Sequence, residues 1–383
     1  METDALAHVL VGEPASTSPG HALTAVDAAH TCRRDLAMLP TARKLAFDDV
    51  PVIDLAAAWS GDAGAYRALA DEIAEVCGRV GFMYIRNHGI PAADVDAIFR
   101  TAADFHDLPR DAKMESAMAR NPDAQGQGYL PGMTKGTSKN LSENLQEAFQ
   151  FRRPLADNDP DLLAGKPLHG RIPWPTAMPD LKQRMMGYYG KVDALGYELL
   201  KLFELALDLP AGALKDYFKK DMNSLRILHY PPQDPEEDGV HLGARAHTDT
   251  NAFTILAQDH NGGLEIRNRD NEWVAVPPVA GTFVVNVGEV LKVWSDAIFS
   301  STLHRVINRS GRERYSIPFF MYPSYDALIQ PLMKNPDPSN VAPENLHTSM
   351  PRDRPFVYGE FKAQSTARIM PGQVKVPDAA ARA

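Results

Sequence analysis

The chain has 383 residues, of which 44% are hydrophobic, so it can bury the core of one large or two modest domains and is not wholly disordered. Its 40 lysines and arginines against 49 aspartates and glutamates give a net charge of −9. No basic run accompanies this balance, which argues against nucleic acid or an anionic membrane as a partner. Two cysteines, an acidic start and no long apolar stretch favour a cytoplasmic protein.

The N-terminal half predicts a short extension followed by alternating strands and helices. Residues 1–45 have no firm period and are interpreted as an extension. Strands are predicted over 51–55 and 82–85, with helices over about 66–80 and 95–105. Residues 110–180 are rich in turn formers and predict an excursion over a site, with one strand at 147–151. Apolar residues at three- and four-residue steps then predict a long buttress helix over 181–208.

The C-terminal half changes to an alternating period, typical of antiparallel strands. Eight short strands are predicted, over 225–230, 252–257, 263–266, 273–276, 282–287, 290–294, 302–307 and 315–322. Together they indicate a mixed α and β fold with a mainly β core, a jelly roll flanked by helices. The expected regions are an extension (1–45), a helix-rich N-terminal region (46–220), the β core (221–325) and a C-terminal segment (326–383).

Three residues of the β core have the chemistry of a metal site. His247 and Asp249 are two residues apart, so both side chains project from one face of an extended strand, and His304 lies in another predicted strand. Two imidazoles and a carboxylate form the facial triad of non-haem iron(II) oxygenases. A surface turn is the alternative for His-x-Asp alone, and a structural zinc site would usually recruit cysteine, whereas Cys32 and Cys77 lie far upstream.

An anion-binding pair follows the second histidine. Arg314 and Ser316 alternate onto one strand face, and an inward guanidinium requires an anion, which it binds through two charge-assisted hydrogen bonds. For Arg-x-Ser alone the alternative is a surface ion pair with Glu313. Tyr230 lies on one face of its strand with Arg226. Tyr230 is a candidate for the same anion, and Arg226 for an acidic group on a substrate, with core packing and a rim ion pair as the alternatives.

Aromatic residues are the candidates for the substrate pocket, because alternation allows them to point inward, although core packing is the commoner role of phenylalanine. These candidates are Phe149, Phe151, Phe253, Phe320 and Tyr322.

Several ordered motifs resemble the isopenicillin N synthase-like family of iron(II)/2-oxoglutarate-dependent oxygenases. The C-terminal ones are His247-Thr-Asp249, Gly262-Gly-Leu264, Val285-Asn-Val-Gly288, Ser301-Thr-Leu-His-Arg-Val306 and Arg314-Tyr-Ser316. Those of the N-terminal region are Pro51-Val-Ile-Asp-Leu55 and Gly81-Phe-Met-Tyr-Ile-Arg-Asn-His-Gly-Ile-Pro91. The chain departs from the family at Leu228, where members often carry Asn, and at Glu289, where Asp is more usual.

The resemblance implies a distorted double-stranded β-helix with iron(II) held by His247, Asp249 and His304. It also implies that Arg314 and Ser316, helped by Tyr230, bind the distal carboxylate of 2-oxoglutarate. The expected activity is oxidation of a small molecule by O₂, by hydroxylation, desaturation or ring closure, with release of succinate and CO₂. An iron oxidase of the isopenicillin N synthase type that needs no 2-oxoglutarate is the enzymatic alternative, and a metal-free jelly-roll binding module is the alternative from another class.

Overall fold

The computed structural model describes residues 50–132, 145–233, 242–335, 349–351 and 353–376. The extension expected over residues 1–45 lies outside this range. Within the described residues, no helix combines the length and the apolar character needed to cross a membrane.

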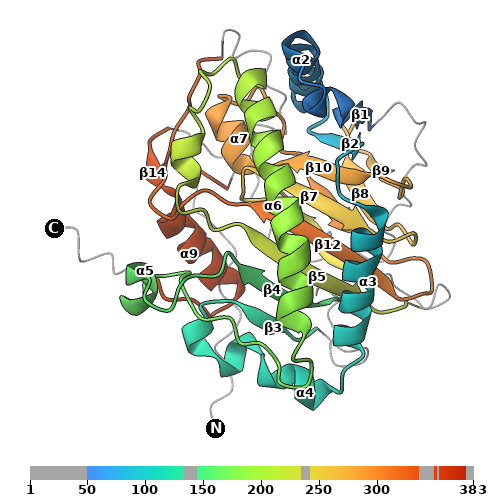
Figure 1. Cartoon of the computed structure of the whole chain (residues 1–383), viewed down its shortest axis with the longest axis vertical. Coiled ribbons are helices and arrows are strands. Elements are labelled where there is room, and N and C mark those ends of the chain that lie inside the picture. The colour runs from blue at the N-terminus through green and yellow to red at the C-terminus, as the bar shows by residue number, and fades with distance from the viewer. Residues whose placement is uncertain (1–49, 133–144, 234–241, 336–348, 352, 377–383) are drawn as a thin grey trace, which may run out of the picture.

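The core of the fold is a large sheet in which strands of the N-terminal region flank a central block of C-terminal strands (Figure 1). Its order is β1 (Val52–Asp54), β2 (Phe82–Arg86), β10 (Phe283–Val287), β7 (Phe253–Gln258), β12 (Arg314–Met321), β5 (Ser224–Tyr230), β4 (Glu147–Arg152) and β3 (Gly128–Leu130). All described pairings are antiparallel except that of β1 with β2. The N-terminal region therefore completes both edges of the sheet that carries the candidate anion site.

A smaller sheet faces the large one and closes the second layer of the barrel. Its order is β6 (Ala244–His247), β11 (His304–Val306), β8 (Leu264–Arg267) and β9 (Trp273–Ala275). Apolar side chains from both sheets pack together between them, among them Tyr84, Leu228 and Ile266. This arrangement has the double-stranded β-helix character that the sequence predicts.

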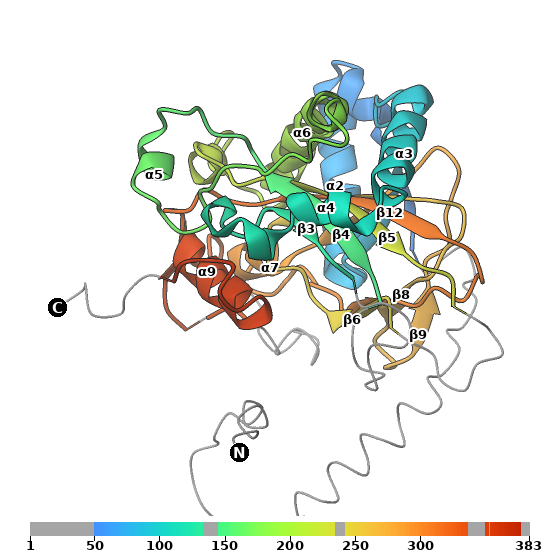
Figure 2. The same ribbon diagram turned by 90° about the horizontal axis from the view of Figure 1, so that it is seen from below.

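Three long helices cover the outer face of the large sheet. The long helix α6 (Leu181–Ala206) crosses that face and packs against both α2 (Ala63–Arg79) and α3 (Ala92–His106), on the side opposite β6, β8 and β9 (Figures 1 and 2). The α6 side chain of Phe203 packs on Phe253 of β7, with ring centroids 4.7 Å apart. Burial of such a ring contributes roughly 1.5–3 kcal/mol, so α6 stabilises the sheet as the expected buttress.

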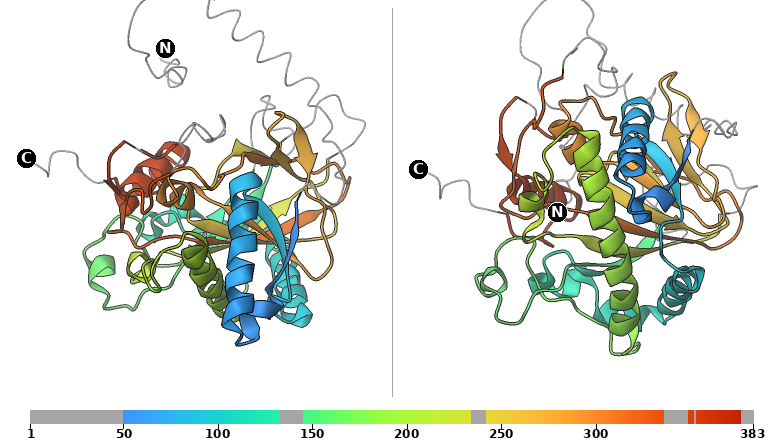
Figure 3. Two further views of the ribbon diagram at one scale, coloured as in Figure 1. Left: turned by 90° about the horizontal axis from the view of Figure 1, so that it is seen from above. Right: turned by 45° about the horizontal axis from the view of Figure 1, so that its top comes forward.

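Shorter elements complete the chain. They are the 3₁₀ segments at Leu55–Trp59, Met118–Arg120, Pro122–Ala124 and Lys215–Phe218, the helices α4 (Arg110–Glu115), α5 (Pro160–Leu163), α7 (Glu289–Trp294) and α9 (Tyr358–Ile369), and the strand pair β13 (Leu328–Ile329) and β14 (Phe356–Val357). Figure 3 shows α9, in dark red, at the same end of the molecule as α7, in orange.

Most predicted elements are confirmed, and two expectations fail for physical reasons. Residues 290–294 were expected to form a strand but form helix α7, in which every residue is buried, so neither a period of 2 nor one of 3.6 shows in the sequence. Strand β6 was not expected, because its Ala-Arg-Ala-His sequence has no apolar alternation.

Candidate active site

Two imidazoles and a carboxylate converge between the two sheets. His247 ends β6 and pairs directly with His304 of β11. Their Nε2 atoms lie 3.8 Å and 3.9 Å from the same Asp249 oxygen, Oδ1, and the three ligand atoms all lie within 4.8 Å of one another. His304 and Asp249 are buried, whereas the His247 side chain is 45% exposed, so the group opens to solvent on one side. This geometry can hold one metal ion and leave coordination positions free.

Hydrogen bonds orient each of these three side chains. The Nδ1 atoms of His247 and His304 face the backbone carbonyls of Arg245, at 2.7 Å, and Thr302, at 3.1 Å. A carbonyl only accepts, so both Nδ1 atoms carry a proton, and the Nε2 atoms of both rings face Asp249.

Asp249 is fixed through its other oxygen. Its Oδ2 accepts hydrogen bonds from Thr254 Oγ1 at 2.5 Å and from Asn286 Nδ2 at 2.8 Å. The backbone N–H of Glu289 donates to the carbonyl of Asp249 at 2.8 Å, so the start of α7 holds the loop that carries the carboxylate. Such partners around the ligands fix ring and carboxylate orientation in metal sites.

The protonation states suit a cation. Burial, reinforced by the neighbouring His247, lowers the pKa of His304 to about 4, so its imidazole is neutral near pH 7. Burial alone would raise the pKa of Asp249, but the two imidazoles and the donors Asn286 and Thr254 outweigh it, and its pKa is lowered. A neutral imidazole and an ionised carboxylate are the forms that ligate a metal.

A buried guanidinium lies in the same interior. Arg314 is fully buried at the start of β12, its Nε donates to the carbonyl of Gly262, and its Cζ lies 4.5 Å from the centre of the Tyr230 ring. Its Nη1 has no hydrogen-bond partner among the described residues. Ser316 lies on the same strand face and is also buried. A buried Nη1 without a partner needs an acceptor, and a carboxylate supplies one.

The turn beside Arg314 requires glycine. Gly263 has φ +94°, and a Cβ there would lie 2.6 Å from the carbonyl oxygen of Ile307. Only a residue without a side chain adopts this conformation at low cost, and the turn brings the Gly262 carbonyl to Arg314.

Three of the expected pocket residues do face the interior. Phe320 pairs in register with Thr254, which donates to Asp249, so the two side chains share a face. The ring of Tyr322 stacks on Phe320 at 5.6 Å, and Arg226 Cζ lies 5.3 Å from the centre of the Phe320 ring.

The other three expected pocket residues face the wrong way. The rings of Phe149 and Phe151 pack on Trp174 at 5.4 Å and 5.3 Å, and Phe253 packs on Phe203 of α6. They belong to the core between the large sheet and the helices, so their assignment to the substrate pocket is wrong. Alternation shows which side chains share a face of β4 or of β7. It does not show which face points toward the metal site and which toward the helices, because both faces of these strands are largely buried.

Sequence reasoning missed several residues around the site. Thr254 and Asn286 hold Asp249, and Asn286 stands inside the Val285-Asn-Val-Gly288 motif, which was the available signal. Tyr358 and Lys362 of α9 contact Thr250, the residue after Asp249, and no sequence pattern pointed to them.

A second group of possible metal ligands, His106, Glu147 and His229, lies on the helix-facing side of the large sheet. Glu147 accepts from Lys113 Nζ at 2.9 Å and 3.1 Å, and His229 bridges Glu147 and Glu313 at 2.8 Å and 2.5 Å. Burial opposes protonation of His229, but these carboxylates outweigh it and raise its pKa. The carboxylates of Glu147 and Glu313 thus pair with Lys113 and His229, so the group needs no metal ion to balance its charge, and we interpret it as a structural network.

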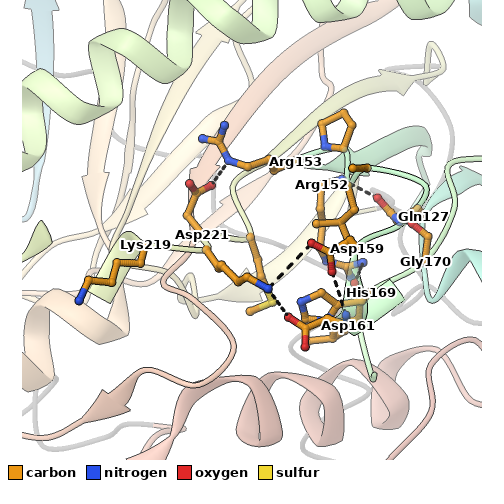
Figure 4. A pocket seen from close by; sticks show the side chains of 15 residues that line it. Gln127, Arg152, Arg153, Asp159, Asp161, His169, Gly170, Lys219 and Asp221 are labelled. Carbon is orange, nitrogen blue, oxygen red and sulfur yellow. Dashed lines mark hydrogen bonds and ion pairs between the residues drawn. The ribbon is translucent and has the colours of Figure 1, made fainter. Parts of the chain in front are cut away.

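A polar pocket beyond the end of β4 is likewise internally paired (Figure 4). Arg153 Nε lies 2.7 Å from Asp221 Oδ1, and Lys220 Nζ lies 3.0 Å from Asp161 Oδ2. These two cations therefore pair with carboxylates of the chain itself, whereas Arg152, which also lines the pocket, donates to backbone carbonyls.

Comparisons with known proteins agree with the geometry. Residues 222–323 match the model of the 2OG-Fe(II) oxygenase superfamily, and residues 50–177 match that of the N-terminal region of non-haem dioxygenases in morphine synthesis. The 2-oxoglutarate-Fe(II) type oxidoreductase ppzC of Metarhizium majus is 34% identical over 289 residues, which cover 71% of this chain and 77% of that protein. The hxnY oxidoreductase of the same type from Emericella nidulans is 31% identical over 275 residues, covering 70% and 78%.

Solved structures show the same fold. A full-length Neurospora crassa protein, crystallised in complex with alpha-KG and thymine, superposes with a TM-score of 0.68 at 25% identity, covering 85% of this chain and 99% of that one. A putative 2OG-Fe(II) oxygenase family protein from Caulobacter crescentus gives a TM-score of 0.67 at 26% identity, covering 84% and 99%. The chain therefore belongs to the 2-oxoglutarate–Fe(II) oxygenase superfamily, and it is a non-haem iron enzyme that uses 2-oxoglutarate as co-substrate.

Proposed function

We propose that His247, Asp249 and His304 are the iron ligands and that Arg314, Ser316 and Tyr230 bind 2-oxoglutarate. The observation that carries the proposal is the convergence of two Nε2 atoms and Asp249 Oδ1, each oriented by a hydrogen bond on its far side. When bound, iron(II) with 2-oxoglutarate and O₂ supplies the oxidising chemistry, with succinate and CO₂ as products.

The chain's own residues hold and orient the reactants. The Arg314 guanidinium, with its Nη1 unpaired, matches the distal carboxylate of 2-oxoglutarate, and the Ser316 hydroxyl adds a donor on the same face. Tyr230 keeps the guanidinium in place from one side, at 4.5 Å. The interior between the sheets excludes water from the reacting groups, while the exposed edge of His247 leaves a route for a substrate.

The iron assignment is tested by anaerobic titration with iron(II) and 2-oxoglutarate, followed through the weak visible metal-to-ligand band. Wild type is expected to develop the band at one iron per chain, and His304→Ala is expected to lose it. His260→Ala, which removes an exposed histidine outside the site, is the matched control and keeps the band. A band of full intensity in a folded His304→Ala protein would contradict the assignment.

The substrate we propose is a small molecule with an acidic group. Arg226 supports this, because its Nε is buried without a partner among the described residues and its guanidinium lies beside Phe320 on the metal-facing side. With candidate substrates screened by succinate release, Arg226→Ala is expected to lose turnover while keeping its affinity for 2-oxoglutarate. Unchanged turnover would end this part of the proposal.

A further inference from the structure

Three cations near the Tyr322 and Phe320 rings have no carboxylate partner among the described residues. They are Arg152 at the end of β4, Arg226 on β5 and Lys362 on α9. Among the described residues, no carboxylate forms an ion pair with any of the three. Arg152 donates only to the backbone carbonyls of Gln125, at 3.0 Å, and Leu168, at 3.2 Å. Clustered cations without counter-charges are costly unless a ligand supplies the missing negative charge.

Lys362 and Arg226 flank one aromatic platform. Lys362 Nζ lies 4.5 Å from the centre of the Tyr322 ring, and Arg226 Cζ lies 5.3 Å from the centre of the Phe320 ring. The two rings are stacked, with centroids 5.6 Å apart and planes 14° apart. The two cations therefore stand on one continuous patch, although they come from a strand and a helix that lie far apart in the chain.

This patch adjoins the candidate iron ligands. Lys362 Nζ donates to Thr250 Oγ1 at 2.9 Å and to Tyr322 Oη at 3.2 Å. Tyr358, one turn earlier on α9, donates from its hydroxyl to the Thr250 carbonyl at 2.8 Å. Since Thr250 follows Asp249 directly, α9 packs against the metal-binding loop.

The surrounding field is positive. Burial, together with the charge of Arg226, lowers the pKa of Arg152 to about 10, so this guanidinium remains cationic at neutral pH beside the other two groups. In the pocket of Figure 4, which Arg152 also lines, Arg153 pairs with Asp221 and Lys220 with Asp161. Those two cations have carboxylate partners, whereas Arg152, Arg226 and Lys362 have none among the described residues.

We infer that Lys362 of the C-terminal helix and Arg226 of β5 together form a carboxylate-binding subsite for the substrate, with Phe320 and Tyr322 as its floor. Arg152, whose Nη1 donates to two backbone carbonyls, adds positive charge near this subsite. This inference rests on the proposed oxygenase site and makes Lys362 a specificity-determining residue for small organic acids.

The test uses full-length protein loaded anaerobically with iron(II) and saturating 2-oxoglutarate. The probes are three carboxylates and their neutral primary amides: phenylacetate, 3-phenylpropanoate and hexanoate. Dissociation constants are measured by calorimetry. Wild type is expected to bind at least one acid about tenfold to a hundredfold more tightly than its amide, the difference that a charge-assisted hydrogen bond produces.

Four variants separate charge from packing. Lys362→Met keeps a stem to cover Tyr322 but removes the charge, and it is expected to abolish the preference for the acid, as is Arg226→Gln. Lys362→Arg keeps the charge and is expected to retain the preference. Arg368→Gln removes an exposed cation from the same helix and is the matched control.

Two results would overturn the inference: no acid binds more tightly than its amide to wild type, or the preference survives in Lys362→Met. The visible band of the iron(II)–2-oxoglutarate complex is recorded for every sample. If the band forms and the acid preference is missing, the subsite is wrong and the oxygenase assignment stands. If the band itself fails to form in wild type, the proposed iron and co-substrate site is what fails.

Discussion

Replacing Arg314 with glutamine tests the co-substrate site most directly. Arg314 is fully buried, and its Nη1 has no partner among the described residues, so binding of a carboxylate supplies the missing acceptor. Charge-assisted hydrogen bonds contribute about 1.5–3 kcal/mol each. Two such bonds at the lower value amount to about 3 kcal/mol, which raises the dissociation constant of 2-oxoglutarate by about 140-fold.

The assay is urea unfolding with and without 2-oxoglutarate in the presence of iron(II) under argon. At a ligand concentration of about 100 times the wild-type dissociation constant, 2-oxoglutarate stabilises wild type by about 2.7 kcal/mol. The same concentration should stabilise Arg314→Gln by only about 0.3 kcal/mol. Arg312→Gln, which changes an exposed arginine two residues upstream, should behave like wild type. Ligand stabilisation of Arg314→Gln equal to that of wild type would refute the assignment.

Three further outcomes follow from the geometry. Asn286→Ala removes a donor to Asp249 Oδ2 and should weaken iron(II) binding by about 10- to 100-fold in a metal competition assay; unchanged affinity would contradict the orienting role. Because the pKa of His229 is raised in the folded protein, its contribution to stability is complete below about pH 6.5 and is lost as pH rises through the raised pKa. The difference in unfolding free energy between wild type and His229→Gln should therefore shrink as the pH rises above about 6.5, and a constant difference would exclude this linkage. Phe151→Ala should cost about 3–5 kcal/mol of stability and leave 2-oxoglutarate affinity unchanged, as a core position requires; the reverse pattern would return Phe151 to the pocket.

Local rules in the sequence were sufficient to single out the candidate metal and anion residues, whose roles remain proposals. Residues two apart on an extended strand share a face, so Arg314 could be paired with Ser316 before any fold was known. The same rule was applied to His247 and Asp249, but β6 ends at His247 and Asp249 lies in the loop that follows. The structure places His247 and Asp249 beside His304, and the arginine and serine beside Tyr230, as the motifs predict. Strand and helix periods likewise located the buttress helix α6 and most strands of the β core.

Only the tertiary structure showed which face of each strand points toward the metal site. The large sheet is buried by helices on one side and by the small sheet on the other, so Phe151 and Phe320 carry the same hydrophobic signal although they face opposite layers. Helix α7 is also buried on all sides, so its hydrophobic pattern did not distinguish it from a strand. Lys362 could not be singled out from the sequence. A lone lysine on a C-terminal helix becomes informative only when its contacts with distant residues such as Thr250 and Tyr322 are known. The sequence by itself determined the chemistry carried by each strand, whereas long-range packing determined which of those side chains share a site.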